Sequence, residues 1–184
     1  MKFAFVFPGQ GSQSVGMMQA WAARDEVRQT FTEASDTLGM DLWQLVNEGP
    51  AEVLNQTRHT QPAMLAADVA IWRAWCAAGG PMPALLAGHS LGEYAALIAA
   101  NTLAFADAIS LVRFRADAMQ AAVAEGVGAM AAILGLDDNI VREVCREAAQ
   151  GDVVEAVNLN SPGQVVIAGH KAAVERAMAL ALEK

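Results

Sequence analysis

The segment Gly88–Gly92, with the sequence Gly-His-Ser-Leu-Gly, constrains the fold of this chain more than any other. A short apolar run, 84–87, precedes it, and a proline-free segment rich in Ala and Leu, 91–100, follows it. The run is typical of a buried strand and the following segment of a helix, so the pentapeptide is predicted to be a sharp strand-to-helix turn. Small residues two positions before and after Ser90 let the neighbouring backbone pass without a clash. The pattern favours an α/β fold in which Ser90 lies above a helix N-terminus.

A serine in this setting can act as a nucleophile. The helix N-terminus carries partial positive charge, which favours a developing anion. The backbone N–H of Leu91 points toward the oxyanion position in such turns. His89 cannot easily fold back onto Ser90, because adjacent side chains diverge, and we expect it to fill space and form a hydrogen bond beside the turn. A plain Gly-x-Ser-x-Gly turn without chemistry remains the alternative at this point.

Composition limits the classes of protein. The chain has 184 residues, of which 54% are hydrophobic and 17% charged, so it suits one domain or one and a half with a large core. Its net charge of −8 argues against nucleic-acid or anionic-membrane binding, and gives no overall attraction to an acidic partner. The apolar run at 3–7 is too short for a signal peptide, and no segment is apolar for the ~18 residues that span a bilayer. We expect a soluble, cytoplasmic protein.

Neither the cysteines nor the histidines form a recognisable site. Cys76 and Cys145 stand singly, without metal-ligand spacing, and are expected to be reduced core residues, so no metal is predicted. His59 and His170 are expected to have surface or capping roles. No general base for Ser90 is identified.

Apolar runs and Gly or Pro breakers divide the chain into two parts near Gly126. The first part begins with a strand at 3–7, predicted to be buried on both faces, and a glycine-rich loop at 8–13. Its predicted helices cover residues 17–38, 41–47, 51–56, 60–78, 91–100 and 105–124, with Pro62 near the first turn of the fourth. The second part has predicted strands at 129–134, 153–159 and 164–168, helices at 138–149 and 170–183, and a turn at 160–163. This β-α-β-β-α order lacks one strand of the split βαβ of a ferredoxin-like module.

Arg115 is predicted to point inward. Its neighbours three and four positions away on a helix are all apolar, whereas Arg113 has Asp117 four positions on and should lie in solvent. A buried guanidinium is costly unless it is paired, so either a distant carboxylate of the fold or a ligand must meet Arg115. A ligand would carry a carboxylate, which matches the guanidinium fork. The loop around Gly9 can supply a second oxyanion donor, form a phosphate cradle or be a simple turn.

Five motifs together identify a family resemblance. The segments Phe7–Gln13, Thr60–Ala63, Gly88–Tyr94 and Asn158–Gln164, together with Arg115, closely resemble those of the bacterial malonyl-CoA:acyl carrier protein transacylases. The resemblance implies an α/β-hydrolase-like large subdomain, residues 1–126, with an inserted ferredoxin-like small subdomain, residues 127–184, both incomplete at the C-terminus. It also implies ping-pong transfer of a malonyl group from coenzyme A to the phosphopantetheine thiol of acyl carrier protein, for fatty-acid synthesis.

The resemblance also implies roles for individual residues. Ser90 would carry the malonyl group, Gln10 and Leu91 would supply the backbone oxyanion donors, and Arg115 would bind the malonate carboxylate. Gln61, Asn160 and His89 would belong to the substrate-binding pocket. No cofactor is implied, and the full-length enzyme is expected to be a monomer.

The chain departs from the family in length. Members are longer, and their catalytic histidine follows the last strand of the small module, beyond residue 184. The sequence is therefore expected to be the N-terminal portion of the enzyme, inactive or impaired by itself. The alternatives are a patatin-like or esterase-like serine hydrolase, which would have no use for an inward cation at Arg115, and a non-catalytic module that binds carrier protein.

Overall fold

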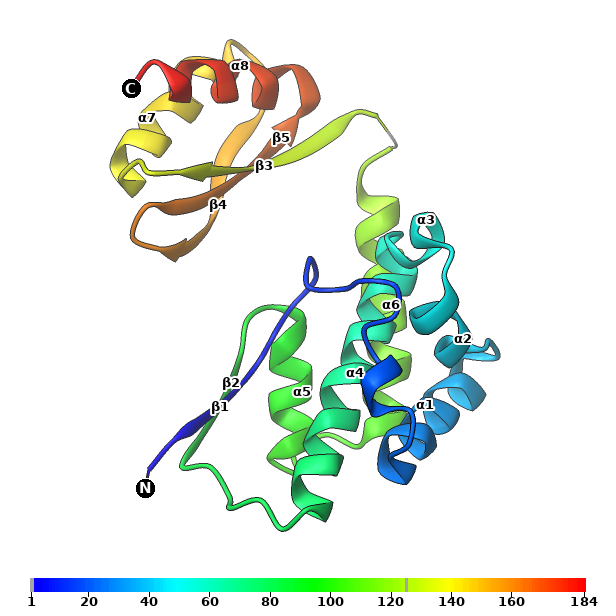
Figure 1. The fold of residues 1–184 in the computed structure, drawn as a ribbon. Coiled ribbons are helices and arrows are strands. Elements are labelled where there is room, and N and C mark those ends of the chain that lie inside the picture. Colours follow the sequence, from blue (N-terminus) through cyan, green and yellow to red (C-terminus); the bar gives the residue numbers. More distant parts are fainter. Residues whose placement is uncertain (1, 125) are drawn as a thin grey trace. The chain divides into compact units, whose positions relative to one another are not determined.

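The computed structural model describes residues 2–124 and 126–184, which form two compact units (Figure 1). One unit extends to Ala121 and the other runs from Ala122 to Lys184. The sequence predicted the boundary between the two parts of the chain near Gly126, whereas the two units divide where the long helix α6 ends.

The first unit combines a small sheet with a layer of helices. Its elements are β1 (Ala4–Phe7), the 3₁₀ turn η1 (Gln19–Trp21), α1 (Asp25–Leu38), α2 (Leu42–Glu48), α3 (Ala51–Leu54), α4 (Thr57–Ala77), β2 (Leu85–Gly88), α5 (Leu91–Ala99) and α6 (Phe105–Ala122). The helix predicted at 17–38 is divided into η1 and α1. The helix predicted at 105–124 ends at Ala122.

Strands β1 and β2 are parallel and in register from Ala4 opposite Leu85 to Phe7 opposite Gly88. Figure 1 shows α5 beside this pair and α4 next to α5. Phe5 and Phe7 pack against Trp72 of α4, with ring centroids 5.2 and 6.3 Å apart. The register brings the C-terminal ends of both strands, and the loops that follow them, to the same edge of the sheet.

The prediction that the first strand is buried on both faces is wrong, and so is the prediction that the second is a buried strand. Val6 of β1 is 67% exposed and Leu85 of β2 is 70% exposed. In the described part of the chain, helices cover only the face that carries Phe5 and Phe7, so the alternate side chains point to solvent.

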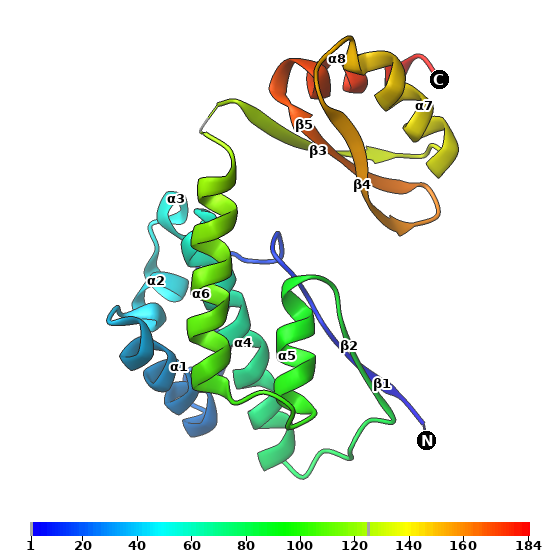
Figure 2. The same ribbon diagram turned by 180° about the vertical axis from the view of Figure 1, so that it is seen from behind.

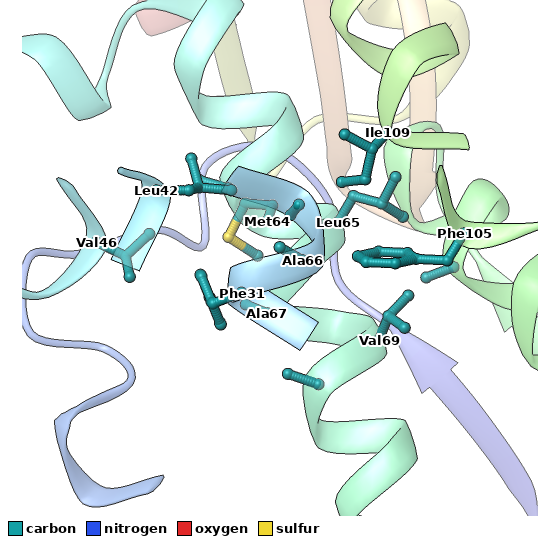
Figure 3. Packing of buried hydrophobic residues seen from close by; sticks show 14 of the residues in the cluster. Phe31, Leu42, Val46, Met64, Leu65, Ala66, Ala67, Val69, Phe105 and Ile109 are labelled. Atoms are coloured by element: carbon teal, nitrogen blue, oxygen red, sulfur yellow. The ribbon is translucent and has the colours of Figure 1, made fainter. Parts of the chain in front are cut away.

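Helix α4 is the central element of the core. Figure 3 shows its Met64 and Leu65 packed among Phe31 of α1 and Ile109 of α6. The helix begins at Thr57, earlier than predicted, and Pro62 therefore lies inside it rather than in its first turn. A proline there removes one intrahelical hydrogen bond. Burial of most of the residues from Thr60 to Ala70 offsets that loss.

The second unit has the predicted β-α-β-β-α order, shown in Figure 2. Its elements are β3 (Gly128–Leu134), α7 (Asp138–Ala149), β4 (Val154–Ser161), β5 (Gln164–His170) and α8 (Lys171–Leu182). The strands form an antiparallel sheet in the order β3-β5-β4, and both helices pack on it around Val144, Val165 and Val174. The central position of β5 follows from its apolar sequence, since its Val165 and Ile167 are completely buried.

The turn predicted at 160–163 is shorter than expected. Ser161 pairs with Gln164, so only Pro162 and Gly163 connect β4 to β5. Gly163 has a φ of 76°, a conformation that favours glycine. Asn160 therefore belongs to β4, at an irregularity in its pairing with β5, and is exposed.

No helix within residues 2–124 and 126–184 is long and apolar enough to cross a membrane.

Candidate active site

Ser90 lies at the junction between β2 and α5 in a strained backbone conformation. Its φ of 54° and ψ of −104° are rare for a residue with a side chain, and such a conformation costs of order 1–3 kcal/mol. The strand before it, predicted at 84–87, covers Leu85–Gly88, and the helix after it begins at Leu91, as the sequence predicted. The side chain of Ser90 is exposed, so its hydroxyl is accessible.

The two glycines of the turn are required by close backbone contacts. A Cβ on Gly88 would collide with the carbonyl carbon of Gly92, and a Cβ on Gly92 would collide with the carbonyl oxygen of Phe7. Both obstacles are backbone atoms, which cannot move aside as a flexible side chain can. The turn is therefore locked between β1 and the start of α5.

Arg115 joins this turn from helix α6. Its Nη2 donates a hydrogen bond to Ser90 Oγ at 2.8 Å, and its Nη1 donates to Gln61 Oε1 at 2.6 Å. Arg115 turns toward Ser90 and Gln61 as predicted, but it is only half-buried, and its apolar neighbours Leu111 and Met119 are 45% and 48% exposed. Two residues earlier, Arg113 donates to Asp117 at 2.9 Å, and the prediction that Arg113 lies in solvent is wrong, because its side chain is only 26% exposed.

The guanidinium of Arg115 is contacted by neutral groups of the fold. Among residues 2–124 and 126–184, no Asp or Glu forms an ion pair with its guanidinium. The partners are neutral oxygens, and the ring of Tyr94 lies 5.9 Å from the guanidinium carbon. A cation held by neutral groups next to an accessible hydroxyl is a suitable place for an anionic ligand.

Gln61 connects Arg115 to the loop after β1. The side chain of Gln61 is completely buried, and its Nε2 donates to Gln10 Oε1 and to Met119 Sδ, both at 3.3 Å. Met119 and Tyr94 were missed as site residues. Met119 could have been found, because it lies four positions after Arg115 on the same helix face.

The loop that carries Gln10 lies against the serine turn. A Cβ on Gly9 would come within 3.0 Å of the carbonyl oxygen of His89, so the two backbones approach closely. The N–H of Leu91 is among the first of α5, which have no partner within the helix. Gln10, in the loop after β1, and Leu91, at the first position of α5, thus lie at the same edge of the sheet, where two backbone donors can converge.

The prediction that His89 fills space and forms a side-chain hydrogen bond beside the turn is wrong. Its side chain is exposed, and no residue of the described chain forms a hydrogen bond with it, because no element covers that side of the turn. Only its backbone contributes: its carbonyl oxygen accepts from the N–H of Gly92 at 3.0 Å. Asn160 lies in the second unit, on β4.

The other two histidines have the predicted local roles. His59 Nδ1 lies 3.1 Å from the carbonyl oxygen of Val53. His170 precedes α8, and its Nδ1 accepts a hydrogen bond from the N–H of Val153 at 3.0 Å. No histidine of the described residues forms a hydrogen bond with Ser90.

Two further groups differ from expectation. Cys145 is buried as predicted, but Cys76 is exposed near the end of α4.

Asp68, on α4, is a buried carboxyl whose Oδ2 has no hydrogen-bond partner within the described chain, and burial raises its pKa from the ordinary 3.8 to about 7. Nothing in the sequence around Asp68 signalled this. No cluster of three or more metal-ligating side chains occurs in residues 2–124 and 126–184.

Comparison with known proteins identifies the family of the chain. Residues 4–182 match the acyl transferase domain family. The chain belongs to that family. It is 62% identical over 177 residues to a protein named malonyl CoA-acyl carrier protein transacylase from Salmonella typhimurium, an alignment that covers 96% of this chain and 57% of the relative.

Solved structures show the same fold at high identity. The acyl-carrier-protein S-malonyltransferase of Burkholderia pseudomallei superposes with a TM-score of 0.95 at 63% identity, over 100% of this chain and 60% of that one. A malonyl-transacylase solved in complex with a type II PKS acyl-carrier protein gives a TM-score of 0.96 at 58% identity, over the same shares of the two chains. The chain has the mixed α/β fold of these acyltransferases and spans 57 to 60% of the length of these relatives.

Proposed function

We propose that this chain carries the acyl-accepting serine of a malonyl-CoA:acyl carrier protein transacylase, which transfers malonyl groups for fatty-acid synthesis. The contact of 2.8 Å between Arg115 Nη2 and Ser90 Oγ carries the proposal. A malonyl group bound to Ser90 has its free carboxylate only two bonds beyond the ester carbonyl, so the guanidinium that now donates to the hydroxyl is within reach of that carboxylate. An uncharged acyl group offers it no such partner.

The chemistry divides into two half-reactions at Ser90. Its Oγ attacks the malonyl thioester carbon, and the carbonyl oxygen becomes an oxyanion that the backbone N–H groups of Gln10 and Leu91 stabilise. The C–S bond then breaks, coenzyme A leaves as a thiol with a proton, and malonyl-serine remains. The phosphopantetheine thiol of the carrier protein attacks this ester in turn, which regenerates the Ser90 hydroxyl.

The proton of Ser90 needs an acceptor. Since no described histidine forms a hydrogen bond with Ser90, we expect acylation of the 184-residue chain to lack general-base help, which is typically worth ~10²–10⁴ in rate. The chain should therefore form malonyl-serine slowly, rather than turn over like a complete enzyme.

The proposal also covers the two subdomains, the substrate-binding residues and the partners. The parallel β1–β2 pair with its serine turn supports an α/β-hydrolase-like large subdomain, residues 1–126, and the order β3-β5-β4 supports an inserted ferredoxin-like small one, residues 127–184. Gln61 and His89 are assigned to the malonyl pocket, and a substrate-binding role for Asn160 remains a prediction. Malonyl-CoA and acyl carrier protein are the proposed partners, in line with the names of the relatives, and a cytoplasmic location remains a prediction.

Intact-mass spectrometry after incubation with malonyl-CoA tests the proposal. We expect a slow mass increase of one malonyl group on the chain and none on Ser90→Ala. An acyl group that forms and is then lost to water without a thiol acceptor would instead support the serine hydrolase. Binding of carrier protein with no acylation, even at long incubation, would support the non-catalytic module and refute the transferase.

A further inference from the structure

The buried amide of Gln61 determines where Arg115 can lie. Its Oε1 accepts the 2.6 Å hydrogen bond from Arg115 Nη1, and its Nε2 points the other way. The guanidinium has only donors, so Gln61 must present its oxygen to it. The N–H groups of Gln61 then need an acceptor of their own, because an unsatisfied donor in a completely buried side chain is costly.

Gln10 supplies that acceptor through its side chain. Its Oε1 accepts from Gln61 Nε2 at 3.3 Å, and the only other acceptor there, within the described residues, is the sulfur of Met119, which is a weak one. Without Gln10 Oε1, the Gln61 Nε2 group would keep only the weak sulfur acceptor, and the orientation of the Gln61 amide would be less well fixed.

Thr57 holds the Gln10 side chain from the other end. Gln10 Nε2 donates to Thr57 Oγ1 at 3.3 Å. Thr57 is the first residue of α4 and lies four positions before Gln61, hence on the same face of the helix. A continuous series of hydrogen bonds therefore leads from the start of α4 to Ser90 through Gln10, Gln61 and Arg115.

The loop that carries Gln10 is held by further hydrogen bonds besides the one to Thr57, so the backbone from which the Gln10 side chain extends has a defined position. The N–H of Gly11 donates to Gln13 Oε1 at 2.8 Å, and Gln13 Nε2 donates to Asn55 Oδ1 at 2.9 Å, just before α4. The loop is thus attached to the region where α4 begins, next to Thr57.

We propose that Thr57 and the side chain of Gln10 are positioning groups that set the acyl selectivity of the Ser90 site. They keep the Gln61 oxygen toward Arg115, and thereby keep the guanidinium beside Ser90, where it meets the carboxylate of an acyl group. Gln10 then has two separable functions: its backbone N–H is the proposed oxyanion donor, and its side-chain amide acts on Arg115 through Gln61. The reference to acyl selectivity rests on the proposed function, whereas the positioning of Arg115 does not.

Substitutions can separate the effect of the Thr57 and Gln10 side chains from the effect of the Gln10 backbone N–H. Thr57→Val removes the hydroxyl at nearly constant shape, Thr57→Ser retains it, and Gln10→Met removes the amide but keeps the backbone N–H. Thr32→Val is a matched control, because the Thr32 hydroxyl bonds only to the carbonyl oxygen of Arg28 on an exposed turn of α1. Melting temperatures identify any variant that does not fold, and the Thr57 series suffices if Gln10→Met fails.

The readout is the Nε–Hε resonance of Arg115 in the ¹⁵N-labelled 184-residue chain, alone and titrated with monomethyl malonate or methyl acetate. In Thr57→Val and Gln10→Met, we expect this resonance to shift toward that of a solvent-exposed arginine, and the affinity for monomethyl malonate to fall about two- to tenfold. The response to methyl acetate should not change, Thr57→Ser should behave like the unaltered chain, and Thr32→Val should have no effect.

An unchanged Arg115 resonance and unchanged monoester affinity in both Thr57→Val and Gln10→Met would overturn the proposal, as would equal losses in Thr57→Ser and Thr57→Val. The test is separate from that of the proposed function. If Ser90 accepts no malonyl group, the Arg115 resonance of the free chain still decides whether Thr57 and Gln10 position the guanidinium.

Discussion

Replacing Arg115 by Ala should reduce malonyl loading of Ser90 much more than acetyl loading. In the free chain the guanidinium already contacts Ser90 Oγ at 2.8 Å, so it needs little movement to receive a carboxylate. A hydrogen bond to a charged group contributes about 1.5–3 kcal/mol, and since Arg115 is only partly buried we take about 2 kcal/mol. That corresponds to a loss of about 30-fold in the malonyl-to-acetyl ratio of acylation rates.

The assay measures acyl-enzyme formation by intact mass with malonyl-CoA and acetyl-CoA on the same preparation. The ratio cancels any general damage, including the effect of leaving Gln61 Oε1 without its donor. Arg113→Ala is the matched control: it lies two residues earlier on α6 and bonds Asp117 instead, so its ratio should not change. If Arg115→Ala slowed both acyl groups equally, Arg115 would be a structural residue and the selectivity argument would fail.

Two predictions concern stability. Gly92→Ala should lower the free energy of unfolding, measured by urea titration, by about 3 kcal/mol or more, because the new methyl group meets the carbonyl oxygen of Phe7. The control is Gly39→Ala, which has a φ of 65° but lies in open space, and should lower the free energy of unfolding by only about 1–2 kcal/mol. Equal losses in the two variants would contradict this account. Since burial raises the pKa of Asp68 from 3.8 to about 7, the folded chain holds a proton between these pH values that the unfolded chain has lost, so stability should fall as pH rises through this window. Asp68→Asn should lose that part of the pH dependence, and an unchanged slope would show that Asp68 is not its source.

Predictions from the sequence succeeded where a residue pattern is sterically compatible with only one local structure. The pentapeptide around Ser90 predicted the strand-to-helix turn, because only small residues fit at Gly88 and Gly92. Helix periodicity predicted that Arg115 points toward the rest of the fold, and it does reach Ser90, but it did not separate the burial of Arg115 from that of Arg113, since both are half-buried. The limits of α7 were predicted to the residue, since its strongly amphipathic pattern is bounded by turns at both ends.

The sequence was least informative where the outcome depends on distant contacts. The exposure of Val6 and Leu85 depends on how many layers cover the sheet, which an apolar run cannot reveal. The hydrogen bond between Gln10 and Gln61 joins residues 51 positions apart, and no local pattern encodes it. The buried carboxyl of Asp68 was likewise hidden in a helix whose other buried residues are mostly apolar.

The most direct test is a crystal structure of the chain after reaction with malonyl-CoA. The account predicts an ester bond at Ser90 Oγ, with the malonyl carboxylate within hydrogen-bond distance of the Arg115 guanidinium and Gln61 Oε1 still accepting from Nη1. A malonyl group on Ser90 whose carboxylate points into solvent, with Arg115 turned away, would contradict it.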